Sequence, residues 1–255
     1  MIKLERPPKP LQLTEELQIE LTERYTNTGR VVWNQSFIRE VLLLGSHHKC
    51  CYCEKRIGAG FPDMHIDHYL PKSLYPNFVI EWENLMPCCG DCNRSKTNHD
   101  TGKVPIVNPF KDEPKDYFYI KDYLYKAIDN RYDSIANTTI SVLGLNDLDK
   151  KCKKRYMYVT KILEDLKAVL IIAQRNQVVL NTDIALCNNL KRRLRGILRL
   201  CTPEEEYSAF VATAVLSDRD YRDLKNIFIT AGRWSDELRE LEAAAMLCVY
   251  NTVIE

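Results

Sequence analysis

The chain has no long apolar run, no strong net charge and no nucleotide-binding loop of the P-loop type. Its longest apolar stretches, such as "VLIIA", are far too short to span a bilayer. The first residues, "MIKLERPPKPLQLTEELQ", hold no apolar core of signal-peptide length, so we expect a cytoplasmic protein with no membrane partner. Because the sequence has no P-loop, any dependence on ATP must come from another chain.

The formal net charge is only +1, so no overall positive field attracts nucleic acid, and attraction must come from local patches. Basic residues gather in two places, residues 150–155 and 191–199. In the second cluster, Arg192, Arg195 and Arg199 are spaced to form one helical stripe. The stripe could bind phosphates or an acidic partner surface. An ordinary solvent-exposed helix face with no binding role is an equally good interpretation. No aromatic residues interleave with these charges, which argues against binding of single strands by stacking.

Cysteines are abundant and clustered: six of the ten lie between Cys50 and Cys92. A cytoplasmic protein keeps its thiols reduced, which favours metal binding over disulfides for such a cluster. Two C-x-x-C turns, Cys50 to Cys53 and Cys89 to Cys92, are separated by 35 residues and match a four-sulfur structural zinc site. Cys88 stays open as a replacement for Cys89.

The organisation of the sequence predicts an α+β protein in three parts. Residues 1–45 form an N-terminal helical extension, with helices starting near Thr14 and spanning about 33–44. Residues 46–110 are rich in Pro and Gly and form the cysteine-framed domain, in which the zinc supplies stability that packing cannot. Residues 111–255 show helical periodicity and predict an all-α domain of roughly five helices.

Local patterns refine this reading at three places. We expect strands at about 64–69 and 78–82, and a short helix beginning near Cys92. In the C-terminal domain, Thr202-Pro203 has the pattern of a helix start, with a cap, a proline in the first turn and an acidic residue behind them.

Between the two cysteine turns lie residues of a catalytic type. Asp67 and His68 stand at the end of an expected strand, three residues before Pro71, and Asn93 directly follows the last cysteine. The segments "IDHYLPKS" and "ENLMPCCGDCNRSK" resemble the ββα-metal core of an HNH endonuclease with its zinc turns.

The resemblance extends along residues 33 to 155 through "KCCYCEKRI", "VPIVNPFKDEP" and "TISVLGLND". In order and content these segments are similar to the PtuB family, the HNH partners of Septu-type and retron-associated anti-phage systems. The resemblance implies a defence nuclease controlled by an ABC-type ATPase partner. The helical domain, which lacks a catalytic motif, is the expected docking surface.

The expected chemistry is phosphodiester hydrolysis of nucleic acid, DNA by default, with RNA or tRNA left open because attack by water needs no 2′-hydroxyl. His68 is the expected general base. Asp67 and Asn93 offer hard oxygen ligands to a catalytic Mg²⁺ ion, or to Mn²⁺. The resemblance gives Asn84 the role of bracing the loop that orients His68.

Two further residues are secondary candidates. Strand alternation places His65 on the side of Asp67, where it could bind metal or phosphate or be structural. Lys96 lies three residues after Asn93, so it faces the same way on a helix and suits a phosphate contact or a solvated position. The alternative function from another class is a non-catalytic, zinc-stapled nucleic-acid-binding or adaptor protein.

Overall fold

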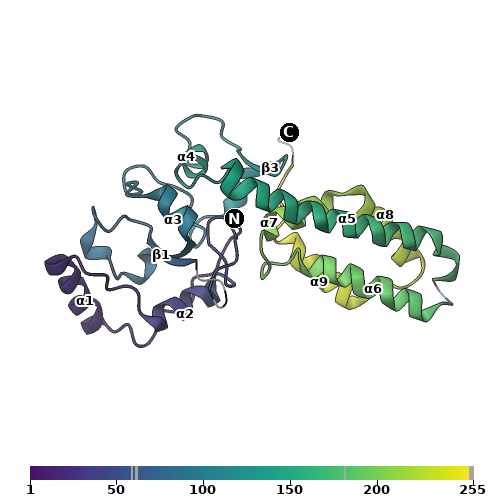
Figure 1. Cartoon of the computed structure of the whole chain (residues 1–255), viewed down its shortest axis with the longest axis horizontal. Helices are drawn as coiled ribbons and strands as arrows, with labels where there is room; N and C mark the ends of the chain where they lie inside the picture. The colour runs from purple at the N-terminus through teal and green to yellow at the C-terminus, as the bar shows by residue number, and fades with distance from the viewer. Residues whose placement is uncertain (59, 61–62, 181, 253–255) are drawn as a thin grey trace. The chain divides into compact units, whose positions relative to one another are not determined.

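The computed structural model describes residues 1–58, 60, 63–180 and 182–252. Contacts divide the chain into two compact units (Figure 1). The first unit comprises Met1–Tyr119 and Leu124–Lys151, and the second comprises Ile120–Tyr123 and Cys152–Glu255. The N-terminal extension and the cysteine-framed segment thus fold within one unit, which also continues beyond residue 110. In the described part of the chain, no helix is long and apolar enough to cross a membrane.

Two helices open the first unit. Helix α1, Glu15–Thr28, begins where the Thr14 side chain accepts a hydrogen bond from the backbone of Leu17 and ends at Gly29, whose φ of 67° is left-handed. Helix α2, Ser36–Gly45, begins three residues later than the sequence suggested. Its buried residues lie on one face, which contacts strand β2.

The centre of the first unit is a ββα motif. Strand β1, Met64–His68, pairs antiparallel with β2, Leu85–Cys89, so that His68 lies opposite Leu85. Helix α3, Gly90–Lys96, follows β2 without a loop and contacts both strands. The prediction of an α+β fold with a small ββα core is confirmed.

The second strand is not where the sequence analysis put it. Residues 78–82 form parts of two short 3₁₀ helices, η1 (Pro76–Phe78) and η2 (Trp82–Asn84), with a turn between them. The apolar residues of this segment have the composition of a strand, although they are helical and turn residues. The second strand is β2, which contains Pro87. Proline is tolerated there because the sheet has only two strands, so each strand has an edge that needs no backbone donor.

The rest of the first unit includes η3 (Pro114–Asp116) and α4 (Ile135–Val142). A second two-stranded sheet pairs β3 with β4. The two strands span Phe118–Lys121 and Leu124–Ala127.

The second unit is helical, as predicted. A π-helical turn, η4 (Leu148–Cys152), precedes the long helix α5, and η5 (Gln177–Val179) follows it. The helices are α5 (Lys153–Arg175), α6 (Ile184–Arg199), α7 (Ser208–Ser217), α8 (Arg219–Thr230) and α9 (Asp236–Met246).

The expected helix start at Thr202 was wrong. Helix α7 begins at Ser208, because Tyr207 takes a left-handed backbone conformation with φ 55° that interrupts helical geometry before it.

Candidate metal centre and active site

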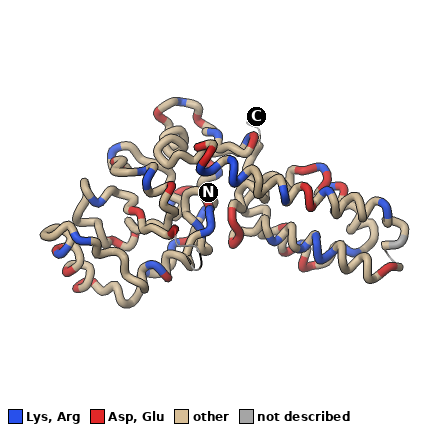
Figure 2. The backbone as a smooth tube through the Cα atoms, viewed as in Figure 1, with Lys and Arg blue, Asp and Glu red and all other residues tan. Residues whose placement is uncertain are grey.

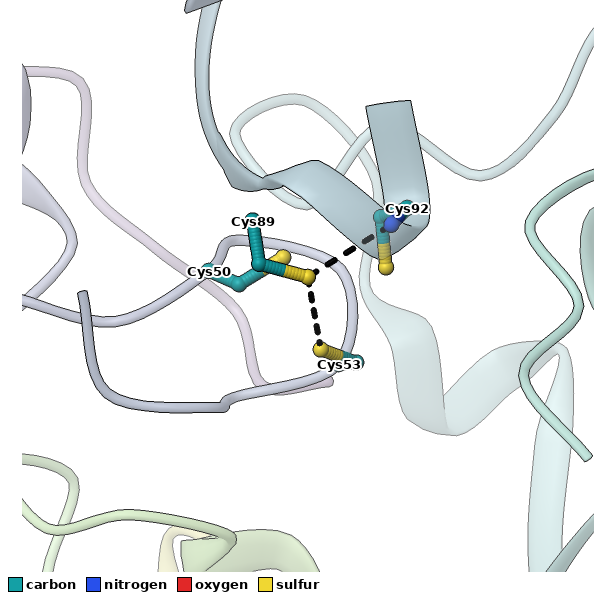
Figure 3. Close-up of side chains that lie close together, drawn as sticks. All are labelled: Cys50, Cys53, Cys89 and Cys92. Atoms are coloured by element: carbon teal, nitrogen blue, oxygen red, sulfur yellow. Dashed lines mark hydrogen bonds between the residues drawn. The ribbon is translucent and has the colours of Figure 1, made fainter. Parts of the chain in front are cut away.

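Four cysteines converge in the first unit. The Sγ atoms of Cys50, Cys53, Cys89 and Cys92 all lie within 4.8 Å of one another, and all four residues are buried (Figure 3). The Cys53 and Cys89 sulfurs are 3.6 Å apart. Zn–S bonds of about 2.3 Å in a tetrahedron put neighbouring sulfurs about 3.8 Å apart, so the donor set fits zinc in both chemistry and spacing.

The backbone explains why these four sulfurs meet. The first turn is closed by hydrogen bonds from Glu54 N to Cys50 O and from Cys50 N to Lys55 O. The backbone N–H of Cys51 donates to Pro87 O, which ties this turn to β2. Cys89 ends β2 and caps α3, accepting from Cys92 N at 3.5 Å.

The structure favours Cys89 over Cys88 as the sulfur ligand. Both are buried, but adjacent residues of a strand point to opposite faces, and it is the Cys89 sulfur that joins the cluster. Hydrogen bonds from the thiols of Cys50, Cys53 and Cys92 lower the pKa of Cys89 far below its usual range, which favours the thiolate that zinc binds. Burial raises the pKa of Cys88 well above that of an exposed thiol, but it does the same for the cluster member Cys50, so position and not acidity separates Cys89 from Cys88.

The imidazole of His68 is buried at the end of β1. Its Nε2 lies 2.8 Å from the carbonyl oxygen of Val79. A carbonyl only accepts hydrogen bonds, so this contact assigns the ring proton to Nε2 and leaves Nδ1 as the basic nitrogen. Burial lowers the pKa of His68 to about 4, with the positive charges of Lys72 and Lys96 acting in the same direction. The ring is therefore neutral at physiological pH, as a general base requires.

Asn84 holds the loop that follows His68. Its Oδ1 accepts from Leu70 N at 2.7 Å, and its Nδ2 donates to Leu70 O at 3.1 Å and to Phe78 O at 2.9 Å. Phe78 directly precedes Val79, the residue whose carbonyl contacts His68. The buried Asn84 amide thus fixes both ends of the segment that orients the imidazole, which is the geometry its expected bracing role needs.

Asp67 and Lys96 form a buried ion pair next to the backbone of His68. Lys96 Nζ lies 3.1 Å from Asp67 Oδ1 and donates to the carbonyl oxygen of His68 at 2.6 Å. The Tyr52 hydroxyl donates to Asp67 Oδ2 at 2.9 Å. Burial raises the pKa of Asp67, and the Lys96 charge opposes that rise. Lys96, with a side chain only 1% exposed, is therefore part of the frame and does not reach solvent as a phosphate-binding lysine would.

The hard-oxygen donors suit a divalent ion, but Asp67 is partly engaged. A carboxylate has about four acceptor sites, of which Lys96 and Tyr52 use two. Asn93 is half-buried in α3, one helical turn before Lys96, and its side chain makes no hydrogen bond to any residue within the described ranges. The oxygen donors of Asp67 and Asn93 are thus of the type that Mg²⁺ prefers, and the Lys96 ammonium already contacts one of the Asp67 oxygens.

Replacing Lys96 by methionine is expected to destabilise the first unit by about 3–5 kcal/mol, because the buried Asp67 carboxylate loses its cation. Urea titrations would measure the free energy of unfolding. The matched control is Lys103→Met, which removes a side chain that is 82% exposed and 3.8 Å from Asp100; we expect a change below about 1 kcal/mol. Equal effects of the two substitutions would show that the Asp67–Lys96 pair is not a structural element.

His65 is on β1 with Asp67 and His68, but its side chain is exposed and approaches Asp63. Its side chain is 45% exposed, and its Nε2 is 3.9 Å from Asp63 Oδ1. Asp63 in turn pairs with Lys55 at 2.7 Å and accepts from Gly90 N. His65 therefore belongs to the polar surface beside the zinc site.

Three residues of the site near His68 were not predicted from the sequence. Trp33 packs edge-on against the imidazole, with ring centroids 4.7 Å apart at 88°. The Lys72 ammonium lies 5.1 Å from the centroid of the Trp33 ring. Tyr52 lies between the zinc ligands Cys50 and Cys53. Its position in the sequence does not indicate that its hydroxyl binds Asp67.

Some residues of each basic cluster are engaged within the protein. Lys151 Nζ caps the end of α4 through the carbonyls of Leu143 and Gly144. Arg155 is buried, with its guanidinium 3.8 Å from the centroid of the Phe210 ring. In the second cluster, Arg195 pairs with Glu237 at 3.2 Å and Arg199 approaches Glu205 at 3.9 Å. Figure 2 shows basic and acidic positions interspersed along these helices, so the arginine stripe is no uniform phosphate track.

Comparison with known proteins shows the family of this chain. A family model described as HNH endonuclease matches residues 50–99, which contain both cysteine turns, Asp67 and His68. The Septu protein PtuB of Bacillus thuringiensis is 34% identical over 241 residues, covering 94% of this chain and 92% of the relative.

More distant relatives match shorter parts of the chain. The Septu protein PtuB of Bacillus mycoides is 26% identical over 164 residues, covering 48% of this chain and 55% of the relative. Protein ea31 of Escherichia phage lambda is 31% identical over 87 residues, covering 33% and 27%. From the match across nearly its whole length, the chain belongs to the PtuB family of Septu proteins and is an HNH endonuclease.

Proposed function

We propose that the protein hydrolyses phosphodiester bonds of nucleic acid as the effector nuclease of a bacterial anti-phage system. DNA is the expected substrate, and RNA, including tRNA, is the alternative. The observation that carries the proposal is the His68 imidazole. Its Nε2 is bound to Val79 O and its pKa is lowered to about 4, so Nδ1 is a neutral base.

The proposed reaction is a direct displacement by water. His68 Nδ1 takes a proton from a water molecule as the water oxygen bonds to phosphorus, and the bond from phosphorus to the 3′ oxygen breaks. The electron pair of that bond stays on the 3′ oxygen, which takes a proton from solvent water and leaves as a 3′-hydroxyl. Asn84 keeps the loop in place, so the imidazole need not reorganise during the reaction.

Two metals have separate roles in this proposal. Zinc at Cys50, Cys53, Cys89 and Cys92 holds the frame. Asp67 and Asn93 are the proposed ligands of Mg²⁺ or Mn²⁺, which would bind a phosphate oxygen and stabilise charge on the leaving oxygen. Soft sulfur and hard oxygen donors keep the two ions apart.

The proposed partner is an ABC-type ATPase of the same defence system, with the second unit as its docking surface. Support comes from the absence of a P-loop in this sequence and from the relatives named Septu proteins. Co-expression of the full chain with the neighbouring ATPase gene is expected to give a co-purifying complex. An ATPase that never co-purifies would contradict the partner assignment.

The function is tested by cleavage assays on duplex DNA and on tRNA, with Mg²⁺, Mn²⁺ or EDTA, with and without the ATPase. We expect cleavage of one nucleic acid that requires a divalent ion. The engagement of both Asp67 oxygens by Lys96 and Tyr52 favours one competing function, a zinc-stapled adaptor that does not cut. Binding without cleavage under every metal and partner condition would support the adaptor.

A further inference from the structure

Lys72 lies beside the proposed base, four residues after His68. The residue is half-buried, and its ammonium stands over the Trp33 ring at 5.1 Å from the centroid. The same ring packs edge-on against His68 at 4.7 Å. Trp33 precedes α2 and lies outside residues 50–99, the segment matched by the HNH model. The N-terminal extension thus supplies the surface on which Lys72 rests.

The backbone around Lys72 is fixed on both sides. Asn84 binds both the N–H and the carbonyl of Leu70, two residues before Lys72. The buried Pro71 directly precedes it, and the Pro71 carbonyl accepts from Leu74 N and Tyr75 N, both at 2.9 Å. A lysine on an anchored turn loses less conformational freedom on binding a ligand than a lysine on a mobile loop.

The positive charge of Lys72 is not balanced locally. Lys96 is paired with Asp67, and Lys55 is paired with Asp63. For Lys72, by contrast, no described carboxylate lies within ion-pair distance. Its field also reaches the imidazole, where it contributes to lowering the pKa of His68. A rigidly placed, uncompensated cation next to a base invites an anion from outside the protein.

We propose that Lys72 binds the backbone phosphate of the nucleic acid beside His68, and that Trp33 is the positioning residue that holds the Lys72 ammonium there. The proposal rests on the proposed function, since it names the contact that sets the phosphate against the base. The cation–π contact limits the positions of the ammonium while leaving its donors available to phosphate oxygens.

The test uses the salt dependence of binding by the full chain in EDTA, without cleavage. The probes are a fluorescein-labelled DNA duplex of about 20 base pairs and a labelled tRNA, titrated between about 50 and 200 mM KCl. For the probe that the wild type binds, Lys72→Ala is expected to reduce the slope of log K against log[salt] by about 1 and to weaken binding regardless of base sequence. Lys72→Arg should keep the slope, and Lys103→Ala, which removes an exposed lysine of the same unit, should leave it unchanged.

A double-mutant cycle tests the role of Trp33. Trp33→Phe keeps an aromatic face under the ammonium and is expected to bind the probe as the wild type does, whereas Trp33→Leu weakens binding. In the Lys72→Ala background, Trp33→Leu should have no further effect, because its role is exerted through Lys72. An equal loss in both backgrounds would reduce Trp33 to a packing residue and overturn its positioning role.

The outcomes separate this inference from the proposed function. An unchanged slope in Lys72→Ala, or a wild type that binds neither probe, overturns the phosphate contact. If the wild type binds with the expected Lys72 dependence but never cleaves with Mg²⁺ and the ATPase present, the nuclease proposal fails and the contact stands. If the wild type cleaves and Lys72→Ala changes neither cleavage nor slope, the contact alone is wrong.

Discussion

Replacing Cys89 by serine is expected to remove zinc from the protein and to unfold the ββα motif. Cys89 ends β2, caps α3 and supplies one of four clustered sulfurs, so one substitution removes the metal link that β2 and α3 share with the first cysteine turn. Structural zinc sites bind with about 10–16 kcal/mol. That is comparable to the whole stability of an ordinary domain, about 5–15 kcal/mol.

The measurement combines zinc content by mass spectrometry with limited proteolysis of the full chain. The wild type is expected to hold one zinc and to resist cleavage between residues 50 and 99, and Cys89→Ser to lose both properties. Cys88→Ser is the matched control, because Cys88 is the buried neighbour in the same strand and lies outside the sulfur cluster. Zinc retained by Cys89→Ser and lost by Cys88→Ser would reverse the ligand assignment.

Replacing His68 by alanine is expected to lower the rate of cleavage about 10²–10⁴-fold, the usual contribution of a general base. Binding of nucleic acid in EDTA should be retained, because the loss concerns proton transfer and not the phosphate contact. Single-turnover cleavage at saturating protein measures the chemical step.

The control for this substitution is His99→Ala. The His99 ring also lies against a backbone carbonyl, with Nε2 2.7 Å from Val104 O, but the residue follows α3 and does not contact Trp33 or Val79 in the described structure. We expect His99→Ala to cleave at the wild-type rate. A His68→Ala variant as active as His99→Ala would remove His68 from the mechanism.

The zinc ligands and the ββα order could be predicted because their signals are local. A C-x-x-C turn specifies its own geometry, and β1 ends on the Asp67-His68 pair that the sequence marks. The choice between Cys88 and Cys89 needed the structure, since it depends on which face of β2 each residue occupies.

The second strand was misplaced because its sequence contradicts strand propensity. "LMPCC" contains a proline, whereas Val79, Ile80 and Trp82 have the composition of a strand but pack into the core from consecutive turns. Residue preferences alone favour a strand at residues 78–82. Tertiary packing instead places the strand at Leu85–Cys89.

Long-range contacts account for what the sequence did not reveal at the site. Trp33 is 35 positions before His68, and only the fold of the N-terminal extension brings the two rings together. Lys96 could be placed on the right helix face, but its burial follows from the packing of α3 on β1. The assignments of His68, Asp67 and Asn93 to catalysis stay predictions for the experiments above.

The ends of the cleavage products test the central chemical claim most directly, that water attacks phosphorus and the 3′ oxygen leaves, which is the step assigned to His68. Cleavage in ¹⁸O-labelled water is predicted to yield 5′-phosphate ends carrying one labelled oxygen, together with 3′-hydroxyl ends, on whichever nucleic acid is cut. A 5′-hydroxyl paired with a 2′,3′-cyclic phosphate, or a 5′-phosphate without label, would contradict the account.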